Sequence, residues 1–170
     1  MNDLPKRKHP RLKNYDYGSN GYYFVTINTH ENHNLLSKVG RGLAPAEETE
    51  ITLTAVGKIA EEQLFDLEKR FSGIKIDKYV IMPNHIHAIL ILDNSTAGAS
   101  PRPTLSDIIC AYKSLTTRIC NKAFNTPGRK IFQVSFYDEI LENENHYLEA
   151  WQYIENNPLK YILKKEKNLY

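Results

Sequence analysis

The 170-residue sequence has few of the features that mark secreted or membrane proteins. Its only two cysteines, Cys110 and Cys120, fall in one predicted helix without sharing a face, so we predict no disulfide. The longest apolar run, residues 88–92, is far too short to span a membrane. The basic N-terminus is not followed by the apolar stretch of a secretory signal. These absences predict a reducing, cytoplasmic setting and no membrane partner.

Charge is distributed unevenly along the chain. The formal net charge is +2, but residues 1–13 carry +4, residues 158–170 carry +3, and the remainder carries −5. Two basic ends around an acidic body could hold a phosphate backbone, although basic termini that serve solubility alone would look the same. The length fits one domain. We therefore expect a basic arm over residues 1–19 and a single catalytic domain over residues 20–170.

The secondary-structure pattern predicts an α+β fold. Strand-like and helix-like segments alternate, and the segment at 85–92 is apolar on both faces, which is typical of a central strand. A ferredoxin-like antiparallel sheet with helices packed on one face accommodates this order. Strands are predicted at 22–28, 74–80, 85–92 and 132–141, a hairpin at 35–39 and 50–54, and helices at 55–70, 104 to about 124, and 145–156, the last ended by Pro158.

His85 and His87 form the first candidate site. Residues two apart on a strand point to the same side, so both imidazoles project together from the predicted central strand. Neutral imidazoles are suitable ligands for a divalent metal ion. The alternative is a pair of ordinary surface histidines, since a His-x-His pattern alone is a weak signal.

Tyr153 and Asn157 form the second candidate site. They lie four residues apart on the predicted last helix and so share a face, and the column around Tyr153 is too polar for a core stripe. An exposed tyrosine without a role, and an asparagine that only ends the helix, remain alternatives. A phenol, whose ordinary pKa is about 10, becomes a useful nucleophile when a metal ion polarises the target. Mg²⁺ or Mn²⁺ would suit two imidazoles and an amide oxygen.

Four stretches resemble the His-hydrophobe-His single-tyrosine transposases of bacterial insertion sequences, and most closely the branch associated with repetitive extragenic palindromes. They are "YDYGSNGYYFVTI", "DKYVIMPNHIHAILIL", "PTLSDIICAYKSLTTRICN" and "YIENNPLKY". The resemblance implies that His85, His87 and Asn157 bind the metal ion and that Tyr153 attacks DNA. It further implies cleavage and rejoining of single-stranded, hairpin-bearing DNA through a 5′-phosphotyrosine, in transposition or in processing of palindromic repeats.

The same resemblance guides the expected partners. We expect single-stranded or hairpin DNA as the partner, which would associate the protein with the bacterial nucleoid, and we leave open a homodimer or a monomer. The basic side chains expected to contact DNA are Lys6, Arg7, Lys8, Arg11, Lys13, Lys113 and Arg118, although each alone could be an ordinary surface charge.

One stretch departs from the family pattern. Where the family has W-Q-R-x-(F/Y)-(Y/W)-(E/D)-H, this chain has "FQVSFYDE", with Val134 in place of arginine and Glu139 in place of histidine. Residues 131–157 also contain six acidic residues and no lysine or arginine. A DNA-binding protein of the same fold that does not cut is therefore the main alternative. A ferredoxin-like binder of single-stranded RNA is a more distant one.

Overall fold

A four-stranded antiparallel sheet forms the centre of the molecule. The computed structural model describes residues 20–42, 49–93, 95 and 103–167. The sheet has the order β4-β5-β1-β6, and helices α1 and α2 connect its strands in the ferredoxin-like manner. This confirms the predicted fold class and the central position of β5. The elements are β1 (Gly21–Asn28), α1 (Ala55–Arg70), β4 (Ile74–Ile81), β5 (His85–Leu92), α2 (Leu105–Ala123) and β6 (Tyr137–Ile140).

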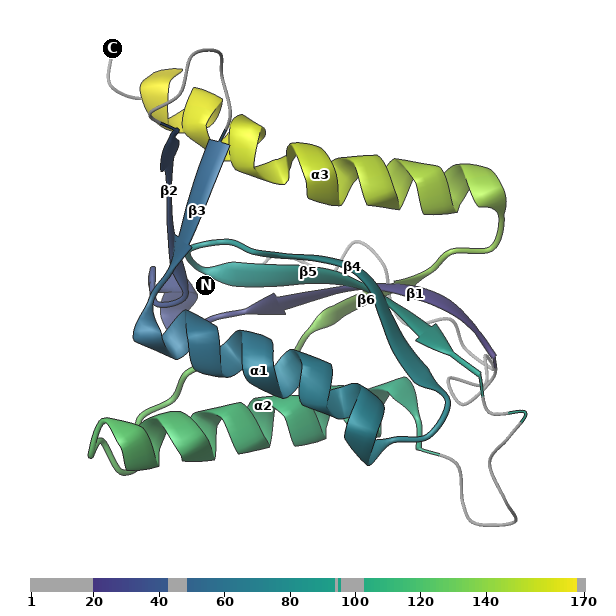
Figure 1. Ribbon diagram of the computed structural model, residues 1–170, viewed down its shortest axis with the longest axis horizontal. Helices are drawn as coiled ribbons and strands as arrows, with labels where there is room; N and C mark the ends of the chain where they lie inside the picture. Colours follow the sequence, from purple (N-terminus) through teal and green to yellow (C-terminus); the bar gives the residue numbers. More distant parts are fainter. Residues whose placement is uncertain (1–19, 43–48, 94, 96–102, 168–170) are drawn as a thin grey trace, which may run out of the picture.

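Side chains alternate along β5, so this strand contributes to one hydrophobic cluster on each face of the sheet. Ile86, Ala88 and Leu90 belong to the larger hydrophobic cluster, together with buried residues of α1 and α2 such as Leu64 and Ile108. Both helices cover one face of the sheet (Figure 1). Ile89 points to the other face and belongs to a second, smaller cluster. Since side chains alternate along a strand, His85 lies on the same face as Ile89.

The prediction that the helices pack on one face is wrong for the last helix. Helix α3 (Glu144–Lys167) crosses the face of the sheet opposite to α1 and α2, as Figure 1 shows. Its Ile154, which is 1% exposed, packs into the second cluster with Phe24, Met82 and Leu141. The smaller cluster thus provides the apolar surface against which α3 packs on that face of the sheet.

The predicted end of this helix at Pro158 is also wrong. A proline inside a helix removes one backbone hydrogen bond, here the one to the carbonyl of Ile154. Pro158 and Ile162 are nevertheless buried, and Arg41 forms a two-point ion pair with Glu166 in the last turns. These tertiary contacts, made against the hairpin of β2 (Ser37–Arg41) and β3 (Thr49–Leu53), stabilise the helix past the proline.

The predicted strand at 132–141 is much shorter than expected. Only β6 pairs with β1, and Phe132 makes an isolated bridge to Thr29. Between them the chain is held by single hydrogen bonds, for example from Gln133 N–H to Asn28 O (2.9 Å). The buried Phe136 lies in this segment and joins the larger cluster. The segment therefore follows the edge of β1 without forming a continuous ladder.

Other expectations are met within the described part of the chain. The helix predicted from residue 104 begins with a capping box formed by Thr104 and Asp107. The structure also has a short 3₁₀ turn, η1 (His30–Asn32), after β1, which was not predicted. Both cysteines are free, as expected. None of the described helices has the length and apolarity needed to cross a membrane. The expected basic arm over residues 1–19 lies outside the described residues.

Gly57, in the first turn of α1, provides a test of this packing. A Cβ added there would lie 1.9 Å from the carbonyl oxygen of Leu36. That carbonyl is fixed by hydrogen bonds from the Thr54 N–H (2.9 Å) and hydroxyl (3.0 Å). We expect Gly57→Ala to lower the free energy of unfolding by about 1–3 kcal/mol, despite the better helix propensity of alanine. Urea unfolding measures this, with Gly40→Ala as the control, because nothing lies within 4 Å of an added Cβ at Gly40. Equal stability of the two variants would contradict the expectation.

Candidate active site

The pairing of β1 with β5 positions the two histidines. Thr26 lies opposite His87, and Asn28 lies opposite His85. The centres of the two imidazole rings are 4.5 Å apart. Both rings occupy the face of the sheet that α3 covers, so they lie between a central strand and the helix that carries Tyr153.

His87 is held in one orientation by two neighbours. Its Nδ1 forms a hydrogen bond with the hydroxyl of Thr26 (2.8 Å), and its ring stacks on Phe24 with ring centres 5.2 Å apart. His87 is only 5% exposed. Burial, aided by the nearby His85, lowers the pKa of His87 to about 3. The imidazole is therefore neutral at physiological pH, with Nε2 left to bind a ligand.

His85 is held by two asparagines. Its Nδ1 forms a hydrogen bond with Oδ1 of Asn84 (2.7 Å), and its side chain also hydrogen-bonds with that of Asn157. Burial lowers the pKa of His85, although the bond to Asn157 acts in the opposite direction. Asn157 is itself buried in α3 at 9% exposure, so it does not merely end the helix. The structure thus brings the three expected metal ligands together.

Tyr153 lies against His87. Its ring centre is 5.2 Å from that of His87 and 5.9 Å from that of Phe24, and both contacts are edge-on. The side chain is 43% exposed, so solvent or substrate can reach it. The ammonium nitrogen of Lys160, from the same helix, lies 5.2 Å from the centre of the Tyr153 ring.

A pocket of about 430 Å³ opens beside this tyrosine. Aromatic rings and strand side chains line it, and Glu139, His146 and Glu149 contribute polar groups. Oε2 of Glu139 accepts a hydrogen bond from the hydroxyl of Tyr137 (3.2 Å). The pocket is therefore aromatic and acidic, and it lies next to the phenol of Tyr153 and the imidazole of His87. The remaining lining residues are Phe24, Thr26, His87, Leu141, Ala150 and Tyr153.

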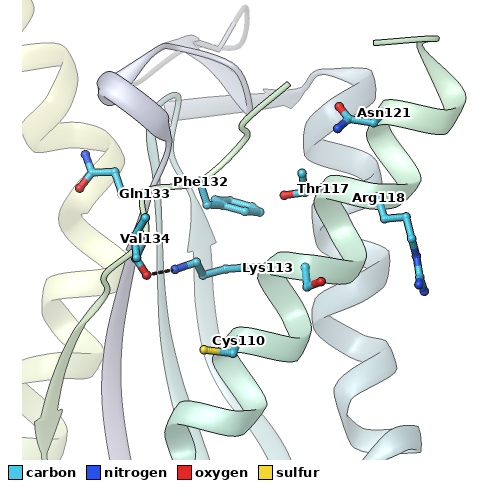
Figure 2. A pocket seen from close by; sticks show the side chains of 9 residues that line it. Cys110, Lys113, Thr117, Arg118, Asn121, Phe132, Gln133 and Val134 are labelled. Carbon is cyan, nitrogen blue, oxygen red and sulfur yellow. Dashed lines mark hydrogen bonds between the residues drawn. The ribbon is translucent and has the colours of Figure 1, made fainter. Parts of the chain in front are cut away.

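A second pocket, of about 530 Å³, has the opposite character. It lies between α2 and residues 132–134, and the stretch 108–137 that forms it contains five lysines or arginines and no acidic residue. Figure 2 shows Lys113 directed at Val134, whose carbonyl accepts a hydrogen bond from its ammonium (2.6 Å), and Arg118 directed away from that contact. Two of the expected DNA contacts thus line a pocket that has no acidic residue in its lining. The other five, in residues 1–13, lie outside the described residues.

The site contains a donor set that fits a divalent ion. In the described part of the chain, no three side chains of His, Cys, Asp or Glu come together as a metal site. A site built on His85 and His87 therefore needs an amide or hydroxyl as its third protein donor. Asn157 is the amide in contact with His85. Two neutral imidazoles and an amide oxygen leave room for water and phosphate oxygens around Mg²⁺ or Mn²⁺.

Several supporting residues were not found by the sequence reasoning. Thr26 and Phe24 hold His87, and Asn84 holds His85. Asn84 is adjacent to His85 in the sequence, so its position was available as a signal. Lys160 follows Tyr153 by seven residues, or two helical turns, and could also have been noted.

The fold is similar to that of a tyrosine transposase of known structure. The solved structure of a REP-associated tyrosine transposase bound to a REP hairpin matches with a TM-score of 0.62 and 19% sequence identity, over 90% of this chain and 74% of that one. An uncharacterized protein of Haemophilus influenzae is 27% identical over 179 aligned residues, which cover 96% of this chain and 93% of the relative.

The chain belongs to the family of IS200-like transposases. The sequence model of that family matches residues 51–157, a range that includes both histidines, Tyr153 and Asn157.

Proposed function

We propose that this protein is a metal-dependent single-stranded DNA transesterase of the transposase type. It cleaves and rejoins hairpin-bearing DNA through a 5′-phosphotyrosine on Tyr153, in DNA transposition or in the processing of palindromic repeats. The observation that carries the proposal is the contact between the Tyr153 ring and His87, with ring centres 5.2 Å apart. The proposed nucleophile and one proposed metal ligand thus lie in contact, although they come from separate elements.

His85, His87 and Asn157 would hold the metal ion, Mg²⁺ or Mn²⁺. When bound, such an ion supplies a Lewis acid that polarises a phosphate oxygen and lowers the barrier to attack by a phenol. The protein's part is to keep both imidazoles neutral by burial and to fix their rings through Thr26 and Asn84. Such supporting hydrogen bonds determine which nitrogen a histidine offers to a metal.

Tyr153 would carry out the covalent step. Its oxygen forms a bond to the phosphorus, and the bond from phosphorus to the 3′ oxygen breaks. The phenol gives up its proton, and the departing oxygen gains one to become a free 3′-hydroxyl. The phosphate ester is conserved in the tyrosine linkage, so attack by a 3′-hydroxyl reverses the step and rejoins strands without ATP.

The DNA would be held mainly away from the acidic pocket. The pocket that Lys113 and Arg118 line contains hydrogen-bond donors from α2 and no acidic residue. The solved transposase with the same fold was bound to a REP hairpin, which supports a hairpin ligand here. Lys6, Arg7, Lys8, Arg11 and Lys13 are proposed to add contacts from the N-terminal arm.

A DNA-binding protein that does not cut remains the second candidate. Val134 stands where the family pattern has arginine and is 94% exposed, while Glu139, in place of histidine, lines the pocket beside Tyr153. Val134 lacks the positive charge that an arginine would carry beside the basic pocket, and Glu139 adds a negative charge to the pocket beside Tyr153. Both changes weaken contacts with DNA phosphate.

Incubation of the purified protein with single-stranded hairpin DNA and Mn²⁺ tests these alternatives on a denaturing gel. We expect a covalent protein–DNA adduct that is absent when EDTA removes the metal ion. Binding without an adduct under any divalent ion would support the non-cutting protein instead. Preferential binding of a hairpin made of RNA would contradict both.

A further inference from the structure

Lys160 is a cation held directly beside the proposed nucleophile. It follows Tyr153 by two turns of α3, and its ammonium nitrogen lies 5.2 Å from the centre of the tyrosine ring. This is within the range of a cation–π contact. The side chain is exposed, and within the described residues it makes no ion pair, so its charge is available to an incoming group.

The neighbouring charges make this position unusual. Lys78 of β4, which also reaches α3, is already paired with Glu155 and lies over the ring of Trp151 at 3.9 Å. The pocket on which Tyr153 borders is lined by Glu139 and Glu149. No lysine or arginine occurs in residues 131–157. Lys160 is thus the positive side chain that the described structure places in contact with Tyr153.

The proposed reaction needs positive charge at this point. A phosphodiester carries one negative charge, and attack by the phenolic oxygen brings more electron density onto its non-bridging oxygens. Donors placed where charge develops stabilise the transition state more than the ground state. A lysine combines a compact charge with a flexible four-carbon stem, so it can turn from the tyrosine ring to a phosphate that arrives next to it.

We propose that Lys160 is a further catalytic residue, which binds the phosphate that Tyr153 attacks and stabilises the charge formed during the attack. This inference rests on the proposed transesterase function. Under this proposal the site has two sources of positive charge. One is the metal ion, and the other is Lys160, which comes from the same helix as the proposed nucleophile.

The test compares three variants in the rate of adduct formation with single-stranded hairpin DNA and in affinity for the same DNA. Lys160→Met keeps an apolar stem over the ring but removes the charge, and Lys160→Arg keeps the charge. Lys164→Met removes a lysine one turn further along α3 and serves as the matched control. We expect Lys160→Met to slow adduct formation about 10- to 100-fold, because loss of one preorganised donor commonly has an effect of this order or larger.

Affinity distinguishes catalysis from general DNA binding. We expect Lys160→Met to change hairpin affinity less than about threefold, Lys160→Arg to keep most of the rate, and Lys164→Met to behave as the unchanged protein. Equal rates for the two methionine variants, or a loss of affinity as large as the loss of rate, would overturn the inference while leaving the adduct of the unchanged protein intact. Absence of any adduct with the unchanged protein would instead refute the proposed function, and the inference with it.

Discussion

Replacement of Tyr153 by phenylalanine is expected to abolish the covalent adduct with hairpin DNA. The substitution removes only the phenolic oxygen, the atom that would bond to phosphorus. Loss of a nucleophile typically slows a reaction of this kind by at least about 10³-fold, which brings the adduct below detection on a gel. The phenylalanine ring can keep the edge contacts with Phe24 and His87, so the folded structure should persist.

The matched control for this variant is Tyr161→Phe. Tyr161 lies on the same helix, partly buried against the smaller hydrophobic cluster, and removal of its hydroxyl should leave the adduct unchanged. Thermal unfolding of both variants would show that α3 is intact. An adduct that persists in Tyr153→Phe would show that another group attacks the DNA, and the assignment of Tyr153 would have to be given up.

The two-residue repeat of a strand explains why the histidine pair could be found in the sequence. His85 and His87 share a face in any strand, and the apolar residues after them predicted a central position, which the pairing of β5 with both β1 and β4 confirms. Likewise, the 3.6-residue repeat of a helix places Asn157 one turn after Tyr153 in any helix. The helical pattern of α1 predicted Ala55–Arg70, and the structure has the same bounds. These inferences required only local periodicity.

Long-range packing explains where the sequence reasoning failed. The side of the sheet on which α3 lies depends on a second apolar surface formed by Phe24, Met82 and Ile89, which come from three separate segments. The passage of α3 through Pro158 depends on contacts with the β2–β3 hairpin. Local propensity favoured an end at the proline, and tertiary contacts reversed that preference.

The supporting groups of the site illustrate the same limit. Thr26 is 61 positions away from His87 in the sequence, and its hydroxyl meets the imidazole only because β1 pairs with β5 in one particular register. A shift of one residue would turn Thr26 to the opposite face of the sheet. Its role could therefore be found only after the strand register was known.

From the connection between β6 and α3 we predict that one chain supplies all the residues of the proposed site. Only three residues separate Ile140 from Glu144. The first of them, Leu141, is 8% exposed, and its N–H donates to the carbonyl of Tyr22 (2.9 Å). The third, Asn143, accepts a hydrogen bond from the N–H of His146 in the first turn of α3 (3.0 Å). A link anchored in this way places α3 over the sheet of its own chain, where the Tyr153 ring contacts that of His87.

His85→Ala is accordingly expected to abolish adduct formation, and addition of the Tyr153→Phe variant should not restore it. The substitution removes one proposed metal ligand from the site, whereas the basic surface around Lys113 and Arg118 is unchanged. Hairpin retention on a native gel should therefore stay within about threefold of the unchanged protein.

When His85→Ala is mixed with Tyr153→Phe and incubated long enough for subunits to exchange, no adduct should form, because neither chain has a complete site. Recovery of the adduct in the mixture would show that α3 crosses to a partner chain, and parallel loss of retention in His85→Ala would show that the histidines also hold the DNA.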